Sequence, residues 1–151
     1  MRSFENIADL KPLVGESIGV SDWLMIDQNR INLFADATGD HQWIHVDPER
    51  ARQGPFKTPI AHGFLTLSLL PAFFATAFEI RRSSTGINYG LDKVRFPAPV
   101  PVNSRLRAHF RLLSWDEIEG GGAQMKIEMT VEVEGAAKPV CIAESITRRF
   151  P

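Results

Sequence analysis

Apolar and polar residues alternate most regularly in the second half of the chain, and this alternation predicts β-strands. Over residues 123–134 (AQMKIEMTVEVE), one face carries only apolar residues: Met125, Ile127, Met129, Val131 and Val133. Residues 104–115 alternate in the same way, with Leu106, Ala108, Phe110 and Leu112 set against Arg105, Arg107, His109 and Arg111. Strands with one apolar face need a covering layer.

Other strands and turns surround these two segments. Residues 19–26 (GVSDWLMI) and 85–96 (TGINYGLDKVRF) are further strand segments, and residues 140–150 (VCIAESITRRF) form a last strand. Turns are expected at the three glycines 120–122 and at residues 135–139 (GAAKP).

Helical signals lie in the first half of the chain. Asp27 is placed to cap a helix over residues 28–38, which Gly39 ends. Asp47 is followed by a first-turn proline and an early acid, and this predicts a second helix to about Gln53.

The longest apolar segment is Gly63–Phe78. A helix that is apolar on nearly every side must be wrapped by other structure, and Pro71 predicts a kink within it. This helix and the strands with one apolar face can cover each other. We therefore expect an α+β fold in which an antiparallel β-sheet wraps around a central buried α-helix. One edge of the sheet is expected to stay unpaired, or one face uncovered, which favours a homodimer.

Composition narrows the functional classes. The chain has 151 residues, 17 basic and 18 acidic, for a net charge of -1. The length predicts one domain over residues 1–151, and the charge balance argues against a nucleic-acid partner. A lone cysteine, Cys141, excludes an internal disulfide and favours a cytoplasmic setting. The interrupted apolar segment falls short of the roughly 20 residues that cross a bilayer, so we expect no membrane partner.

Asp40 and His45 are the first candidates for chemistry. A loop that leaves a helix end at Gly39 lets the carboxylate and the imidazole point at one spot and hold a water molecule between them. The carboxylate accepts one proton of the water, while the imidazole takes or returns the other near neutral pH. Trp43 and Ile44 are expected to keep the surroundings apolar.

Ala61-His62-Gly63 supplies the second part of the predicted site. The first amides of a helix lack internal acceptors and lie at the positive end of its dipole, and a glycine lets a ligand approach them. We expect the Gly63 amide to stabilise an enolate oxygen on a thioester, a type of donor worth about 3 kcal/mol in oxyanion holes. With the water-holding pair, this is what reversible addition of water to an α,β-unsaturated thioester needs, without cofactor or metal.

Residues 34–51 (FADATGDHQWIHVDPERA) and 56–71 (FKTPIAHGFLTLSLLP) resemble the MaoC-like dehydratases, the (R)-specific enoyl-CoA hydratase group of the hotdog superfamily. Within that family, the two segments look like those of the branch that includes the nodulation protein N-like proteins. The resemblance implies a hotdog fold and hydration of trans-2-enoyl-CoA to (R)-3-hydroxyacyl thioesters. It implies that Asp40 and His45 are the catalytic pair and that the Gly63 amide binds the thioester oxygen. It also implies a homodimer, with a coenzyme A or acyl-carrier-protein thioester as substrate and no separate cofactor.

The chain departs from its relatives at one place. Typical hydratases carry Asn-Pro where this chain has Gln42-Trp43. We expect this change to alter the acyl pocket, with Trp43 filling part of it.

Other reactive side chains near these motifs have structural interpretations. Asp47 is expected to cap its helix, and His62 to order the turn before the apolar helix. His41 is expected to be exposed or to support the pair. A metal site is not expected, because no third histidine or cysteine follows His41 and His45 at ligand spacing. Cys141 is predicted to be a buried, inert thiol.

Two other functions share the predicted fold. A hotdog acyl-CoA thioesterase is one alternative, although such enzymes usually place an acidic residue on the central helix and Gly63–Phe78 contains none. A non-catalytic acyl-thioester-binding protein is the other, and the Gln42-Trp43 departure is its main support.

Overall fold

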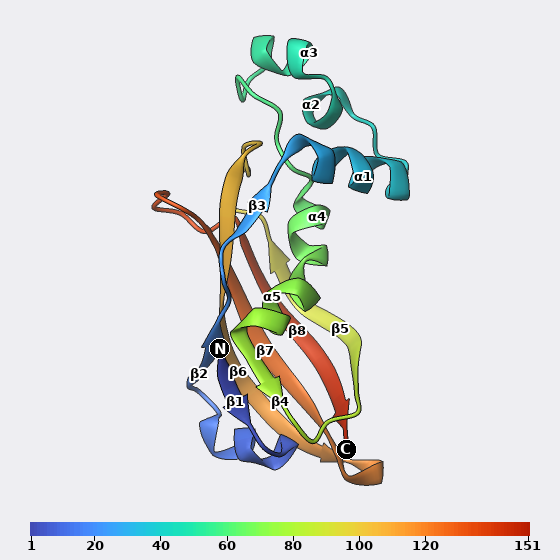
Figure 1. The fold of residues 1–151 in the computed structure, drawn as a ribbon, viewed down its shortest axis with the longest axis vertical. Coiled ribbons are helices and arrows are strands. Elements are labelled where there is room, and N and C mark those ends of the chain that lie inside the picture. Colours follow the sequence, from blue (N-terminus) through green and yellow to red (C-terminus); the bar gives the residue numbers. More distant parts are fainter.

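The computed structural model describes residues 1–151 and is built on a six-stranded antiparallel sheet (Figure 1). The strand order is β2-β6-β7-β8-β5, and β3 pairs with β6 next to β2. The strands are β2 (Ser17–Val20), β3 (Leu24–Ile26), β5 (Thr85–Arg95), β6 (Ser104–Ile118), β7 (Gly122–Val133) and β8 (Cys141–Phe150). The strands expected in the second half of the chain are confirmed, and the three glycines form the β6–β7 turn with η2 (Glu119–Gly121).

The alternation in β6 and β7 decides which face of the sheet is buried. At most 1% of the surface is exposed at the apolar positions Leu106, Ala108, Phe110, Leu112, Met125, Ile127, Met129 and Val131. On the opposite face the strands exchange ion pairs, and Arg107 lies 2.6 Å from Glu132. The predicted inward and outward faces are therefore confirmed.

The apolar segment forms two helices, α4 (Gly63–Ser68) and α5 (Leu70–Ala77), which lie along the sheet (Figure 1). Pro71 stands in the first turn of α5, where its missing N–H removes no helical hydrogen bond. The expected kink is therefore a break at Leu69. The expected wrapping by other structure is incomplete, because one side of the helical segment is exposed. Phe64 is 67% exposed, and exposed residues continue along the same side at Ser68, Pro71, Ala72 and Ala75.

Three helices lie beyond one end of the sheet: α1 (Gln28–Thr38), α2 (Trp43–Val46) and α3 (Pro48–Gln53) (Figure 1). The predicted caps are confirmed. The side chain of Asp27 accepts the Arg30 N–H and that of Asp47 accepts the Arg50 N–H. Gly39 ends α1 with a left-handed φ of 78°, a conformation that glycine adopts without strain.

The N-terminal part differs from the prediction. Residues 19–26 do not form one strand, because Ser21 interrupts it and its hydroxyl accepts the Ala108 N–H at 2.9 Å in place of a backbone carbonyl. The elements η1 (Ile7–Leu13), β1 (Arg2–Phe4) and β4 (Phe78–Ile80) were not predicted, and α2 stands where a loop was expected. The strands β1 and β4 pair in parallel. No helix combines the length and the apolar character that crossing a bilayer requires.

Candidate active site

The segment between α1 and α3 carries Asp40 and His45, and backbone contacts to Ile60 fix it in place. His45 lies in the short helix α2 and is 6% exposed. Its Nδ1 lies 2.7 Å from the Ile60 carbonyl oxygen, and the Ile60 N–H donates to the Ile44 carbonyl. Because a carbonyl only accepts hydrogen bonds, neutral His45 carries its proton on Nδ1. Its Nε2 is therefore the basic nitrogen.

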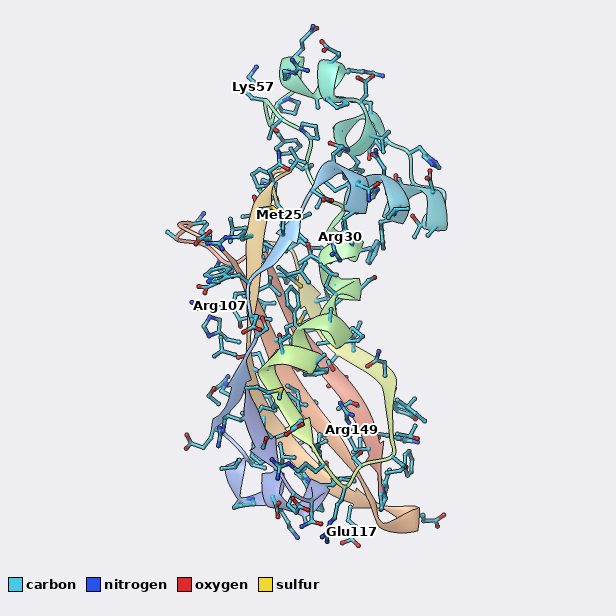
Figure 2. The ribbon with its side chains drawn as sticks, viewed as in Figure 1. Met25, Arg30, Lys57, Arg107, Glu117 and Arg149 are labelled. Carbon is cyan, nitrogen blue, oxygen red and sulfur yellow. The ribbon has the colours of Figure 1, made fainter.

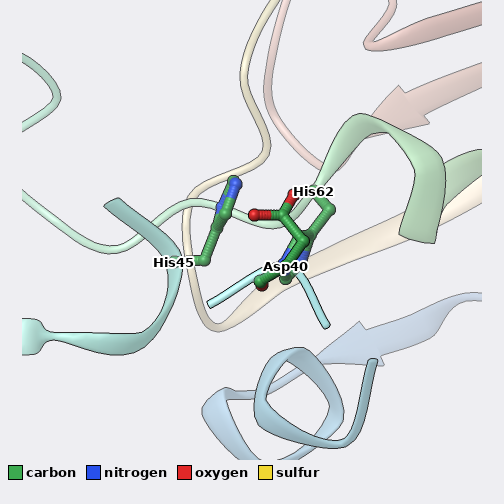
Figure 3. Close-up of side chains that lie close together, drawn as sticks. All are labelled: Asp40, His45 and His62. Carbon is green, nitrogen blue, oxygen red and sulfur yellow. The ribbon is translucent and has the colours of Figure 1, made fainter. Parts of the chain in front are cut away.

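Asp40, His45 and His62 come together, as Figure 3 shows. A carboxylate oxygen of Asp40 and one ring nitrogen of each histidine lie within 4.8 Å of one another. Asp40 itself is exposed, whereas His62 is 3% exposed. The Nε2–H of His62 donates to the backbone carbonyl of Asp40 at 2.9 Å. The fold thus brings the predicted pair together and adds His62 to it.

The environment of His45 favours its neutral form. Burial lowers the pKa of its imidazole below the ordinary 6.5, and the neighbouring His62 lowers it further. The Ile60 carbonyl and Asp40 act in the opposite direction without cancelling the effect of burial. At neutral pH the imidazole is therefore a base with a free Nε2 lone pair.

A cavity of about 330 Å³ borders His45 and Gly63. Its walls are mostly apolar and include Phe56, Ile60, Phe96, Pro97, Ala98, Pro99, Val100 and Val140. Gly63 is the first residue of α4, so its N–H has no acceptor within the helix. A Cβ on Gly63 would lie 2.9 Å from Cδ2 of Phe96, so a larger residue there requires the Phe96 ring or the start of α4 to shift. The predicted amide therefore lies at the wall of the cavity that His45 borders.

Thr66 is a residue of this site that sequence reasoning missed. It is 1% exposed and lines the same cavity, one turn after Gly63. Its hydroxyl has no hydrogen-bond partner, and neither does Nδ1 of His62. A polar residue within a largely apolar helical segment was the available signal. Buried polar groups are almost always paired, so an unpaired hydroxyl on a residue that lines a cavity is a candidate contact for a substrate or a water molecule.

The cluster of Asp40, His45 and His62 brings three potential metal ligands together. The sequence argument that no third ligand accompanies the histidines is wrong, because folding supplies His62. The geometry nevertheless does not fit an ion. The rings of His45 and His62 are stacked at a centroid distance of 3.8 Å and an angle of 24°, so their in-plane lone pairs point side by side rather than at one point.

The remaining predicted residues have structural roles. His41 is exposed and lies 2.8 Å from Asp36, which raises its pKa. Burial raises the pKa of the Cys141 thiol to about 11, as expected for an inert cysteine. The expectation that Trp43 fills part of the pocket is wrong. Its ring packs against Gly54 and under the Arg50 guanidinium, 4.6 Å from the ring centroid, and it does not line the cavity.

Known proteins resemble this chain over nearly its whole length. The sequence is 58% identical to 3-hydroxyacyl-thioester dehydratase Z of Mycobacterium tuberculosis (strain ATCC 25618 / H37Rv) over 148 residues, 98% of each chain. It is 48% identical to nodulation protein N of Rhizobium leguminosarum bv. viciae, covering 94% of this chain and 89% of that one.

Among solved structures, R-hydratase PhaJ1 from Pseudomonas aeruginosa superposes with a TM-score of 0.71 and 27% identity, covering 95% of this chain and 86% of that chain. The (R)-hydratase from A. caviae superposes with a TM-score of 0.73 and 20% identity, covering 91% and 96%. The expected hotdog fold is thereby confirmed. The family model described as MaoC like domain matches residues 9–137. The chain therefore belongs to the MaoC-like family.

Proposed function

We propose that this protein is a hydro-lyase that reversibly hydrates trans-2-enoyl thioesters to (R)-3-hydroxyacyl thioesters. One observation carries the proposal: the Asp40 carboxylate and the His45 imidazole lie together beside a cavity that Gly63 also lines. The names of the relatives, a 3-hydroxyacyl-thioester dehydratase and two R-hydratases, support the same reaction.

In the proposed mechanism, Asp40 and His45 hold one water molecule. Asp40 accepts a hydrogen bond from one O–H, and Nε2 of His45 removes the other proton as the oxygen adds to the β-carbon. The double-bond electrons move to the thioester oxygen, where the Gly63 N–H donates to the developing enolate. The His45 imidazolium then returns its proton to the α-carbon. Dehydration follows the same steps in reverse.

The reaction requires no separate cofactor in this proposal, because a base, an acid and an enolate donor suffice. The substrate is the thioester of coenzyme A or of an acyl-carrier protein. The poor fit of the Asp40, His45 and His62 cluster to a metal ion agrees with this chemistry. We place the reaction in the cytoplasm, in line with the single buried thiol of Cys141. We also treat residues 1–151 as one MaoC-like hotdog domain.

We further propose a homodimer that forms across β5. This strand is the last of the sheet order, so its outer backbone edge is unpaired. Ile87, Tyr89 and Leu91 are between 44% and 57% exposed on it, and the uncovered side of α4 and α5 carries the exposed Phe64. An open edge beside exposed apolar residues is a surface that proteins normally cover. A second copy covers both features at once.

The decisive experiment measures hydration of crotonyl-CoA and of longer trans-2-enoyl-CoA substrates, with the stereochemistry of the product. Asp40→Asn and His45→Gln are expected to abolish turnover in a folded protein. Asp36→Asn and His41→Gln are matched controls. These two residues form an exposed ion pair close to Asp40 in the sequence but outside the site. Near wild-type activity in Asp40→Asn and His45→Gln would refute the mechanism.

The same substrates separate the alternative functions. Release of free thiol without a hydrated product would identify a thioesterase. Calorimetric binding of acyl-CoA without turnover at any chain length would identify a binding protein.

A further inference from the structure

Three buried polar side-chain atoms lack a hydrogen-bond partner: Nδ1 of His62, the hydroxyl of Thr66 and Nε of Arg149. The first two belong to the proposed active site, whereas Arg149 lies outside it. Arg149 lies on β8, far along the sheet from α1 to α3 (Figure 2). It follows Ala143, Ser145 and Thr147 in the alternation of β8, and those three residues are buried on the inner face. The guanidinium cation of Arg149 therefore lies on the inner face of the sheet.

No acidic group of the chain neutralises Arg149. It takes part in no ion pair. The nearest acid of its cavity is Glu79, which accepts hydrogen bonds from Ser3 and Arg81 instead. Burial lowers the pKa of the guanidinium, which reflects the cost of placing an uncompensated charge there. A partly buried cation with unused donors is well suited to binding an anion.

The guanidinium lies at the wall of a cavity of about 520 Å³ between α5, β5 and β8. The backbone of Gly86 packs against it so closely that a Cβ there would lie 2.7 Å from Cζ. Asn88 and Thr147 add polar groups beside it, while Pro71, Phe74, Ala75 and Phe78 form the apolar side. The end of the cavity at Arg149 is thus polar and its helical side is apolar.

A second cavity, of about 400 Å³, joins this one to the helix that begins at Gly63. The two cavities share Pro71 and Asn88 as lining residues. The second cavity continues along α4 and α5 past Leu67, Ser68 and Leu70, with Leu91 on the opposite wall. From Gly63 to Phe74 the helical segment advances about 16 Å at 1.5 Å per residue. This distance is that of a medium-length acyl chain, and Leu67, Leu70, Pro71, Phe74 and Leu91 offer it apolar contacts.

We propose that Arg149 binds a carboxylate at the far end of the acyl chain, so that the preferred substrate is a 2-enoyl thioester with a terminal carboxyl group. The inference rests on the proposed function, since it places the thioester at Gly63. Three features that border the α4–α5 segment match the three parts of such a substrate. The Gly63 amide meets the thioester, the apolar wall of α4 and α5 meets the chain, and Arg149 meets the terminal carboxylate. The polar pantetheine arm of coenzyme A does not match the apolar wall.

The test compares methyl-ended 2-enoyl-CoA substrates with their ω-carboxy counterparts in a chain-length series from butenoyl to hexadecenoyl. For the length that reaches Arg149, the wild-type enzyme is expected to have the higher kcat/KM on the ω-carboxy substrate. Arg149→Met is expected to lower the ratio of the two kcat/KM values about 10- to 100-fold, the range for losing a hydrogen bond to a charged group. Arg149→Lys keeps the positive charge, and its ratio of kcat/KM values is expected to lie between those of the wild type and Arg149→Met.

Arg148→Met is the matched control. Arg148 precedes Arg149 on β8 but donates to Gln124 at 2.9 Å and lies over the Tyr89 ring. The ratio in this variant is expected to equal that of the wild type. The same ratio in Arg149→Met and the wild type would overturn the proposal.

Calorimetry with saturated ω-carboxyacyl-CoA tests the Arg149 site without catalysis, so it still decides the matter if no 2-enoyl thioester is hydrated and the proposed function fails. Binding is expected to weaken in Arg149→Met while the affinity for coenzyme A alone is retained. Two other outcomes overturn the proposal. Equal weakening for coenzyme A alone would assign Arg149 to the coenzyme phosphates. If the wild type is a dimer and Arg149→Met is a monomer, Arg149 instead pairs with a carboxylate of the second copy.

Discussion

The imidazole of His62 is stacked on that of His45, with ring centroids 3.8 Å apart. The same His62 side chain donates from Nε2 to the backbone carbonyl of Asp40. His62 therefore contacts both members of the proposed catalytic pair, one through its ring face and the other through the backbone. Its other face meets Phe34, at a centroid distance of 4.9 Å. The histidine that was expected only to order a turn holds the pair in position.

Replacement of His62 by phenylalanine keeps an aromatic face against His45 but removes the donor to Asp40. We expect kcat to fall about five- to tenfold, the equivalent of one net hydrogen bond of about 1 kcal/mol. Because His62 helps to lower the pKa of His45, the acid limb of the kcat/KM profile should move to higher pH. His41→Phe is the control. An unchanged pH profile together with an unchanged kcat would rule out the positioning role.

The pH dependence of activity should follow His45. Burial lowers the pKa of His45 below 6.5, and the neutral imidazole is the active form in both reaction directions. Activity should therefore be constant near neutrality and fall only below pH 6.5, as the pH passes through the lowered pKa. A profile of kcat/KM whose acid limb has its midpoint above pH 6.5 would contradict this assignment.

Stability should depend on the same group. A histidine whose pKa is lower in the folded state than in the unfolded state binds fewer protons when folded. Its contribution to stability is therefore complete above pH 6.5 and is lost as the pH falls through the folded-state pKa. Urea unfolding of the wild type and of His45→Gln at several pH values measures the difference in their free energies of unfolding. This difference should shrink as the pH falls.

Thr66→Val should change stability and activity in opposite directions. Valine has nearly the shape of threonine and removes a buried hydroxyl that has no partner. The free energy of unfolding should rise by about 1 kcal/mol, the lower end of the cost of an unsatisfied buried group. The kcat/KM for hydration should fall, since Thr66 lines the cavity beside Gly63. A variant that is as active as the wild type would show that Thr66 does not contact the substrate.

Gly63→Ala should damage the site through Phe96. The new Cβ would lie 2.9 Å from Cδ2 of Phe96, so the ring or the start of α4 must shift. A displacement of this kind at a reacting centre costs about 100-fold in rate. A second substitution, Phe96→Ala, removes the clash and should recover part of the loss. Measurement of kcat for the single and double variants checks both statements.

The proposed dimer predicts the effect of a charge on the open sheet edge. Ile87 is 47% exposed on β5 and does not line the cavities beside that strand. Ile87→Lys should shift the mass measured by light scattering to the 16.9 kDa of one chain. The conservative Ile87→Val should retain the wild-type mass. A wild-type protein that is already monomeric would refute the dimer.

Local patterns predicted much of the fold because their physical causes are local. The alternation of β7 follows from the strand period, and the caps Asp27, Gly39 and Asp47 follow from the unsatisfied amides and carbonyls at helix ends. Asp40 and His45 were identified for the same reason, since both lie in one short segment between two such caps. These features depend only on residues a few positions apart.

The features that sequence reasoning missed depend on distant contacts. The β1–β4 pair joins Arg2 to Phe78 across the length of the first half, and no local pattern specifies such a partner. His62 reaches Asp40 across 22 positions. Its part in the site emerged only when α4 and the Asp40 segment were placed together. Trp43 illustrates the converse, because sequence proximity to the pair suggested a pocket residue while the fold turns the ring toward Arg50.

Two of the hydrogen bonds that hold the Asp40–His45 segment link residues 15 and 22 positions apart. Their partners, Ile60 and His62, belong to one short stretch directly before α4. The pair therefore reaches its geometry only when this stretch is in place. During refolding, the return of hydration should accordingly report the assembly of the site, a step separate from the pairing of the sheet strands.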